Sequence, residues 1–155
     1  MENQQRMRPV MFVGTSSDVG KSVITAGFCR IFKQDGYAPA PFKAQNMSLN
    51  SYATPEGLEI GMAQAVQAEA AGIPCHTDMN PVLLKPTTDK SSQVILNGKS
   101  IGNQSAAEYF MSGDRSVLFD EVKLAFQRLS ASYSPIVMEG AGSISELNLK
   151  KRAIT

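Results

Sequence analysis

A nine-residue stretch rich in glycine and serine, GTSSDVGKS at positions 14–22, places the strongest constraint on the fold. The apolar run from Pro9 to Val13 precedes it, and its composition predicts a buried strand. The segment VITAGFCRIFKQDG follows and predicts a helix, with Gly36 just beyond its C-terminal end. A strand, a glycine-rich turn and a helix form the context of a phosphate-binding loop. We therefore expect a nucleotide-binding α/β fold.

The start of a helix suits a polyphosphate because its first backbone N–H groups lack intrahelical partners and the helix dipole is positive there. Lys21 would add a positive charge, and the Ser22 hydroxyl could reach a bound Mg²⁺. We expect the nucleotide to contact ten consecutive residues, namely Gly14, Thr15, Ser16, Ser17, Asp18, Val19, Gly20, Lys21, Ser22 and Val23. The loop is of a variant type, since Thr15 stands where the pattern G-x-x-x-x-G-K-[ST] requires glycine.

The overall composition excludes several classes of protein. The chain has 155 residues, of which 43% are hydrophobic and 19% charged, which is typical of one globular domain and not of a disordered chain. A net charge of +1 gives no sign of a nucleic-acid partner. No apolar run is long enough to span a membrane, and no secretory signal precedes the first strand. We expect a cytoplasmic protein without nucleic-acid or membrane partners.

Three strands of parallel type are predicted near residues 9–13, 40–43 and 135–139. Asn97-Gly98 stands between two apolar runs, which predicts a small β-hairpin near 93–101. Because a doubly wound domain usually has more strands, we expect residues 1–155 to form a single, truncated domain with an incomplete sheet.

Helices are predicted over three segments. In the first, an apolar stripe at i, i+4, i+7 and i+8 should pack on the sheet, formed by Ile24, Phe28, Ile31 and Phe32. The second is predicted over Glu59–Ala71, which is rich in alanine. The third runs from Ser105 to Ser132 with a break at 112–114, and its stripe comprises Val117, Leu118, Val122, Ala125, Phe126 and Leu129.

Two further residues are candidates for the site because they follow strands of the expected sheet. Lys43 lies at the C-terminal end of the second strand, the edge at which ligands bind in open α/β sheets. Glu139 ends the strand PIVME and precedes Gly140-Ala141-Gly142, where the backbone allows a ligand to approach. A carboxylate opposite a phosphate loop is a suitable ligand for Mg²⁺. The amides of Gln45, Asn46 and Asn50 form a polar cluster, a pattern that ordinary loops also show.

Five collinear segments together resemble the N-terminal synthetase domain of the cobyric acid synthase family. They are GTSSDVGKS, FKAQNMSLNS, EIGMAQAVQAEAAG, DMNPVLLKP and EGAGSISELNL, and the resemblance runs from about Val10 to the end. It implies a P-loop NTPase-like three-layer fold and ATP-dependent amidation of carboxylates on a corrinoid, adenosylcobyrinic acid a,c-diamide. The ammonia would come from glutamine, through a glutamine amidotransferase domain that is absent from this chain. A homodimer is left open.

The resemblance also implies roles for individual residues. Lys43 resembles a catalytic lysine, and Lys21 would act with it on the phosphate as the carboxylate becomes an acyl phosphate. Ser22 and Glu139 resemble magnesium ligands, and Glu59 more loosely matches an acidic ligand of dethiobiotin synthetase. Gln45, Asn46 and Asn50 would line the substrate site. Without an amidotransferase cysteine and histidine, this chain is expected to bind ATP and Mg²⁺ but not to hydrolyse glutamine.

Two alternatives stay open. The GTxxDVGK spelling and EGAG are shared with dethiobiotin synthetase, a ligase that uses carbon dioxide, although FKAQNMSLNS disfavours it. A regulatory or partitioning ATPase with a deviant loop usually carries a lysine two residues after the first glycine of the loop. Ser16 occupies that position here, which disfavours this second alternative.

Overall fold

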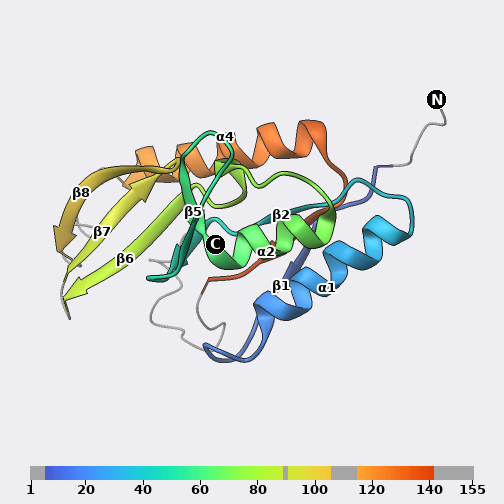
Figure 1. Cartoon of the computed structure of the whole chain (residues 1–155), viewed down its shortest axis with the longest axis horizontal. Coiled ribbons are helices and arrows are strands. Elements are labelled where there is room, and N and C mark those ends of the chain that lie inside the picture. The colour runs from blue at the N-terminus through green and yellow to red at the C-terminus, as the bar shows by residue number, and fades with distance from the viewer. Residues whose placement is uncertain (1–5, 89–90, 106–114, 142–155) are drawn as a thin grey trace.

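The structure is a computed structural model that describes residues 6–88, 91–105 and 115–141 (Figure 1). Its helices are α1 (Lys21–Gln34), α2 (Met62–Ala71), the short 3-10 helix η1 (Thr77–Met79) and α4 (Arg115–Ser132). Its strands are β1 (Val10–Phe12), β2 (Ala40–Phe42), β3 (Gln45–Met47), β4 (Ser51–Ala53), β5 (Glu59–Gly61), β6 (Val82–Thr88), β7 (Ser91–Leu96), β8 (Lys99–Ser105) and β9 (Ile136–Glu139).

The three predicted parallel strands form one sheet in the order β1-β9-β2. β9 lies in the middle, with Phe12 opposite Glu139 on one side and Phe42 opposite Met138 on the other. Ile136 and Val137 are buried on its two faces, as expected for a parallel strand covered by helices. The strand that ends in Glu139 is therefore the centre of the sheet.

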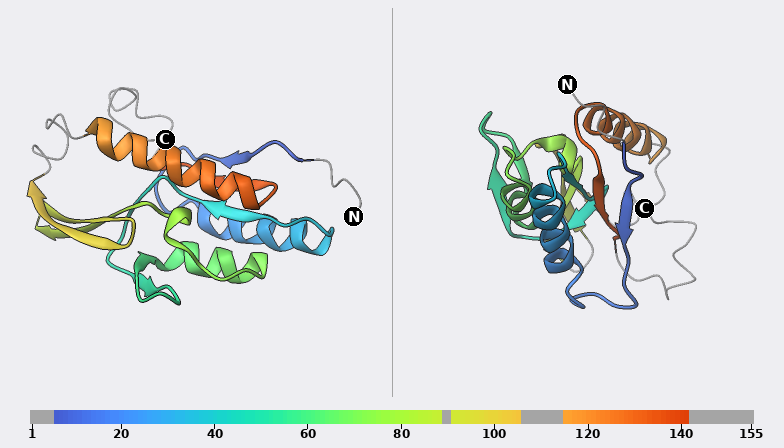
Figure 2. Two further views of the ribbon diagram at one scale, coloured as in Figure 1. Left: turned by 90° about the horizontal axis from the view of Figure 1, so that it is seen from above. Right: turned by 90° about the vertical axis from the view of Figure 1, so that its right-hand side faces the viewer.

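Helices cover both faces of this sheet, so the domain has three layers (Figure 2). On one face Val137 packs with Cys29 of α1 and Ala71 of α2. On the other, Ile136 packs with Leu118, Val122, Ala125 and Leu129 of α4. Neighbouring residues of a strand point to opposite faces, which places Ile136 and Val137 in different layers. The expected mixed α/β fold is confirmed.

A second sheet has the order β3-β6-β7-β8, with β3 parallel to β6 and the other pairs antiparallel. The predicted hairpin is confirmed, because β7 and β8 are joined by Asn97 and Gly98 with φ of 47° and 81°. Both values lie in the left-handed region that two-residue hairpin turns require. The hairpin is part of a larger sheet than predicted, since β6 and β3 extend it.

The prediction that a helix begins at Glu59 is wrong by three residues. Glu59–Gly61 is the strand β5, which pairs with β4 in an antiparallel ribbon, and α2 begins at Met62. Ile60 is fully buried there, and the Gly61 N–H donates to Asn80 Oδ1 at 3.0 Å. Tertiary contacts therefore outweigh the helix propensity of this segment.

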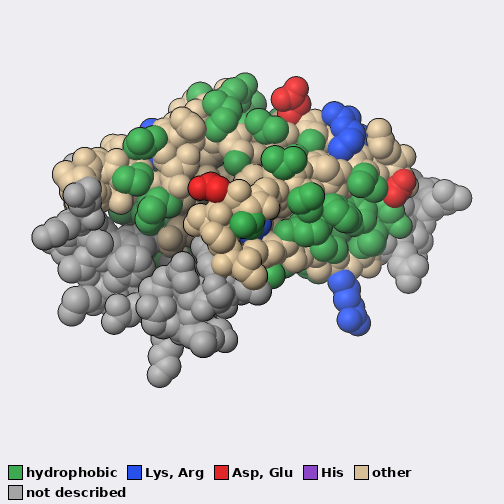
Figure 3. Space-filling model, turned by 90° about the horizontal axis from the view of Figure 1, so that it is seen from below, with side chains coloured by type: hydrophobic (Ala, Val, Ile, Leu, Met, Phe, Trp, Pro, Cys, Tyr) green, Lys and Arg blue, Asp and Glu red, His purple; other side chains and the backbone are tan. Residues whose placement is uncertain are grey.

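The predicted packing of the α1 stripe holds only in part. Phe32 packs against the core cluster of Cys29, Ala71 and Val137, and the centroid of the Phe28 ring lies 4.7 Å from that of Phe12 on β1. Ile24, Phe28 and Ile31 are 50%, 37% and 46% exposed, and the buried residues are Thr25 and Cys29. Hydrophobic side chains accordingly gather on the lower face of the molecule, to which α1 belongs (Figure 3). The contact face of α1 therefore includes Thr25 and Cys29 beside part of the predicted stripe.

The predicted stripe of α4 is confirmed except at Val117, which is 56% exposed. Ser105 lies in β8 and not in a helix, and the predicted break at 112–114 falls outside the described residues. Gly36 has a φ of +88° just after α1, as expected of a residue that ends a helix. Among the described residues, no helix is long and apolar enough to cross a membrane.

Candidate nucleotide site

The ends of the three parallel strands bring the candidate residues to one edge of the sheet. The loop 14–20 follows β1, Lys43 follows β2, and Glu139 ends β9. The Gly140 N–H donates to the Phe12 carbonyl at 2.8 Å, so the pairing of β1 with β9 continues to the ends of both strands. Ligands bind at this edge of open α/β sheets.

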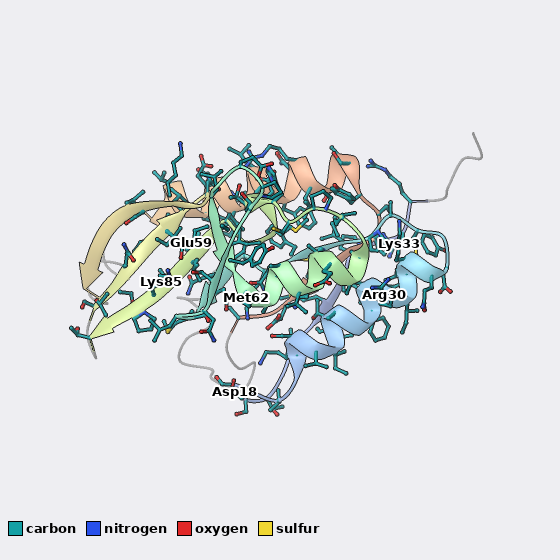
Figure 4. The ribbon with its side chains drawn as sticks, in the orientation of Figure 1. Asp18, Arg30, Lys33, Glu59, Met62 and Lys85 are labelled. Carbon is teal, nitrogen blue, oxygen red and sulfur yellow. The ribbon has the colours of Figure 1, made fainter. Side chains whose placement is uncertain are left out.

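The loop wraps around the start of α1 as a phosphate-binding loop should. Gly20 caps the helix with a φ of 87°, and Asp18 has a φ of 56° at the tip of the loop (Figure 4). No side chain in the described part of the chain caps the helix, which leaves its first N–H groups to a ligand. Lys21 Nζ folds back and donates to the Ser16 carbonyl at 2.8 Å, so its charge lies over the loop.

Three of the predicted residues meet at one carboxylate oxygen. Lys43 Nζ lies 2.7 Å from Glu139 Oε1, and Ser22 Oγ donates to the same oxygen at 2.9 Å. The Glu139 side chain is 2% exposed and that of Lys43 is 13% exposed. An ionised carboxylate only accepts hydrogen bonds, so at this depth it depends on these donors.

Gln67 is a fourth member of this cluster, and sequence reasoning missed it. Its Nε2 donates to Glu139 Oε2 at 3.0 Å and to the Ser22 carbonyl at 3.2 Å. Gln64 and Gln67 are both buried on α2, a helix otherwise rich in alanine. The signal in the sequence was the pair of glutamines three residues apart in a helix otherwise rich in small and apolar residues. Two amides on the buried side of a helix need hydrogen-bond partners, which indicates a polar contact there.

The backbone of Lys43 is held by hydrogen bonds to Met79 and Asn80. Its N–H donates to the Met79 carbonyl at 2.8 Å, and its carbonyl accepts from Asn80 Nδ2 at 3.2 Å. The same Nδ2 donates to the Val82 carbonyl at 2.9 Å, so Asn80 links β2, β5 and β6. The position of the Lys43 side chain is therefore set by several strands at once.

The donor set suits Mg²⁺ bound together with a triphosphate. Among the residues that the structure describes, no three His, Cys, Asp or Glu side chains are grouped to hold a metal ion by themselves. Mg²⁺ on a nucleotide does not need such a group, because it keeps several waters and takes one or two protein oxygens plus phosphate. Ser22 and Glu139 offer two neighbouring oxygens of this kind.

Glu59 lies apart from this cluster. It pairs with Lys85 of β6, and Figure 4 shows the two near β5 and β6. Burial would raise the pKa of Glu59, but hydrogen bonds from Lys85 and Ser51 and the Lys85 charge outweigh it and lower the pKa. The structure does not bring Glu59 together with Ser22 and Glu139, and its role as a metal ligand stays a prediction.

The three amide residues predicted for substrate binding differ in exposure. Asn46 is 7% exposed and donates to Gln64 Oε1 at 3.1 Å, so it holds β3 against α2. Gln45 is partly buried on β3, and Asn50 is exposed in the loop before β4. Asn50 is therefore the best placed of the three to meet a ligand from solvent.

Comparison with known proteins gives one family and a consistent set of relatives. Residues 10–152 match the family described as the CobQ/CobB/MinD/ParA nucleotide binding domain. The chain is 71% identical to a cobyric acid synthase of Phocaeicola vulgatus over 147 residues, which cover 95% of this chain and 30% of that protein. It is 71% identical to one of Parabacteroides distasonis over 98% of this chain and 31% of that protein. A third cobyric acid synthase, of Syntrophobacter fumaroxidans, is 63% identical over 94% of this chain and 28% of that protein.

The chain spans about 30% of the length of the curated relatives it matches. No solved structure matches it significantly.

Proposed function

Because the chain belongs to the CobQ/CobB/MinD/ParA nucleotide binding domain family, we propose that it binds ATP through the loop at 14–22 as the ATP-binding part of a cobyric acid synthase. The single observation that carries the proposal is the meeting of Ser22, Lys43 and Glu139 at one carboxylate oxygen. These residues come from the phosphate-binding helix and from two strand ends. Their convergence supports a site built around a metal-bound phosphate.

The triphosphate would lie along the loop 14–20 and the first turn of α1. The backbone N–H groups there and the Lys21 ammonium would neutralise its charge. Ser22 and Glu139 would hold Mg²⁺, which when bound neutralises phosphate charge and orients the triphosphate. Lys43 pairs with Glu139 in this structure, and a metal ion would share or replace that partner. Lys43 would then be free to turn its charge toward the γ-phosphoryl group.

The reaction we propose for the whole protein is amide formation on a corrinoid carboxylate. A carboxylate resists attack by ammonia because it is negatively charged and lacks a good leaving group. Transfer of the γ-phosphoryl group to it makes an acyl phosphate, from which ammonia displaces phosphate. In this proposal Lys43 would stabilise the charge between the two reactants. Glutamine, through an amidotransferase domain outside this chain, is the proposed source of ammonia.

Titration calorimetry of the chain tests the nucleotide part of this proposal. ATP should bind with Mg²⁺ present, and it should bind more weakly when EDTA removes the metal. If ATP produced no binding heat with Mg²⁺ or with EDTA, and ADP likewise produced none, the proposal would be contradicted. Titration with adenosylcobyrinic acid a,c-diamide in the presence of ATP tests the substrate class. Diaminopelargonic acid is the matched comparison, and preferential binding of it would instead favour a dethiobiotin synthetase.

A further inference from the structure

Gln67 has an amide group whose orientation is fixed by its partners. Both of its N–H bonds point at groups that can only accept, the Ser22 carbonyl at 3.2 Å and Glu139 Oε2 at 3.0 Å. A reversed amide would set its oxygen against those two oxygens, which repel it. The side chain is 1% exposed, so water does not compete for these bonds.

The same orientation leaves the other end of the amide without a partner. Gln67 Oε1 is buried and accepts no hydrogen bond from any described residue. A buried acceptor without a donor is unfavourable for folding. Methionine has a similar size and would fill this space without that cost. Packing therefore does not account for a glutamine at this position.

The two contacts of the amide select which oxygen of Glu139 faces the site. A carboxylate that is free to rotate presents either oxygen to its neighbours. Here Gln67 holds Oε2, and Oε1 alone receives Ser22 at 2.9 Å and Lys43 at 2.7 Å. The second contact, to the Ser22 carbonyl, ties the same amide to the first turn of α1. One side chain thus fixes the carboxylate relative to the phosphate-binding helix.

We propose that Gln67 is a positioning residue of the nucleotide site, which clamps Glu139 so that one oxygen faces the metal and Lys43. The inference rests on the proposed binding of ATP and Mg²⁺ and names a residue through which that binding is organised. Gln67 does not touch the nucleotide itself. Its effect is expected only where Glu139 takes part, that is, in the part of the affinity that depends on the metal.

The first test compares ATP affinity of the chain with Mg²⁺ and with EDTA. Gln67→Met should raise the Kd for ATP about tenfold in Mg²⁺, the effect of losing one hydrogen bond to a charged group, and leave the Kd in EDTA unchanged within about twofold. Gln64→Met is the matched control, because Gln64 is also buried on α2 but bonds Asn46 and not Glu139. Equal weakening under both conditions would assign Gln67 a structural role only and overturn the inference.

Two further variants test the inference if Gln67→Met does not fold and show whether Gln67 acts through Glu139. Gln67→Asn keeps the amide but is one methylene shorter, so it cannot span both acceptors, and it serves if Gln67→Met does not fold. In a Glu139→Gln background, Gln67→Met should cause no further loss of affinity, since the two residues act through each other. Additive losses would contradict the inference.

A measurement without nucleotide separates this inference from the proposed function. If the unaltered chain binds no ATP, the proposed function fails, and the side-chain amide signals of Gln67 in a ¹⁵N-labelled sample still report its contact with Glu139. Glu139→Gln should shift both amide proton signals of Gln67, while those of Gln64 stay in place. Unshifted Gln67 signals would overturn the inference whatever the affinity for ATP.

Discussion

Lys43 and Glu139 lie 96 residues apart in sequence and join the ends of β2 and β9 through a contact of 2.7 Å between Nζ and Oε1. The pair is largely buried, and removal of Lys43 leaves the Glu139 carboxylate without an opposite charge, with Ser22 and Gln67 as its neutral donors. Lys43→Met should therefore lower the free energy of unfolding by about 3–5 kcal/mol in urea denaturation. The double variant with Glu139→Gln should recover part of that loss. A single variant as stable as the unaltered chain would show that the pair is not maintained in solution.

Lys21 is the residue whose loss should affect ATP and little else. Its Nζ donates to the Ser16 carbonyl at the exposed surface of the loop, a contact on which the core does not depend. Lys21→Ala should abolish ATP binding in calorimetry while the thermal unfolding midpoint changes by no more than a few degrees. Arg30→Ala, an exposed cation farther along α1, is the control and should retain affinity. Unchanged ATP affinity in Lys21→Ala would refute the phosphate-loop assignment.

Gly98 in the β7–β8 turn should not tolerate a side chain. Its φ is +81°, and an added Cβ would lie 2.7 Å from both Leu58 Cβ and Thr77 Cγ2. Gly98→Ala should cost about 2–4 kcal/mol of unfolding free energy, from backbone strain and from the clash together. Gly36→Ala is the matched control, because its φ is +88° but nothing lies within 4 Å of the added atom. It should cost about 1–2 kcal/mol, and equal costs would exclude the clash.

Cys29 should be chemically silent in the folded protein. Burial raises the pKa of its thiol from 9.0 to about 12. At pH 8 a thiol of pKa 9 is about one-tenth thiolate, whereas at pKa 12 only about one in 10,000 molecules carries the reactive form. Because alkylation requires the thiolate, Cys29 should react appreciably only at a pH far above neutral. Alkylation followed by peptide mass spectrometry should modify Cys29 only after denaturation. Modification in the native state would show that the α1–sheet contact opens.

The sequence predicts best where local chemistry and tertiary contacts agree. The strand before Gly14, the turn at Asn97-Gly98 and the strand that ends in Glu139 each have a local reason for their structure. Lys43 and Glu139 could be placed at one edge of the sheet from topology alone, because the C-terminal ends of parallel strands share that edge.

The errors arise where distant contacts decide. Glu59–Gly61 has helix-forming neighbours, but pairing with β4 and the bond from Gly61 to Asn80 hold it as a strand. Ile24 and Ile31 of the α1 stripe are exposed, whereas Thr25 and Cys29 are the buried residues of that helix. The glutamines of α2 indicate a buried polar contact, but the sequence of α2 does not show that the acceptors of Gln67 come from α1 and β9.

Asn80 joins three sheets through one side chain. Its side chain is 1% exposed and uses every donor and acceptor except one lone pair, on Lys43, Gly61 and Val82. Lys43 leads to the nucleotide edge, whereas Gly61 and Val82 belong to the strands beside the polar segment 45–50. One buried amide therefore fixes the backbone that carries the Lys43 side chain relative to the strands that hold Gly61 and Val82.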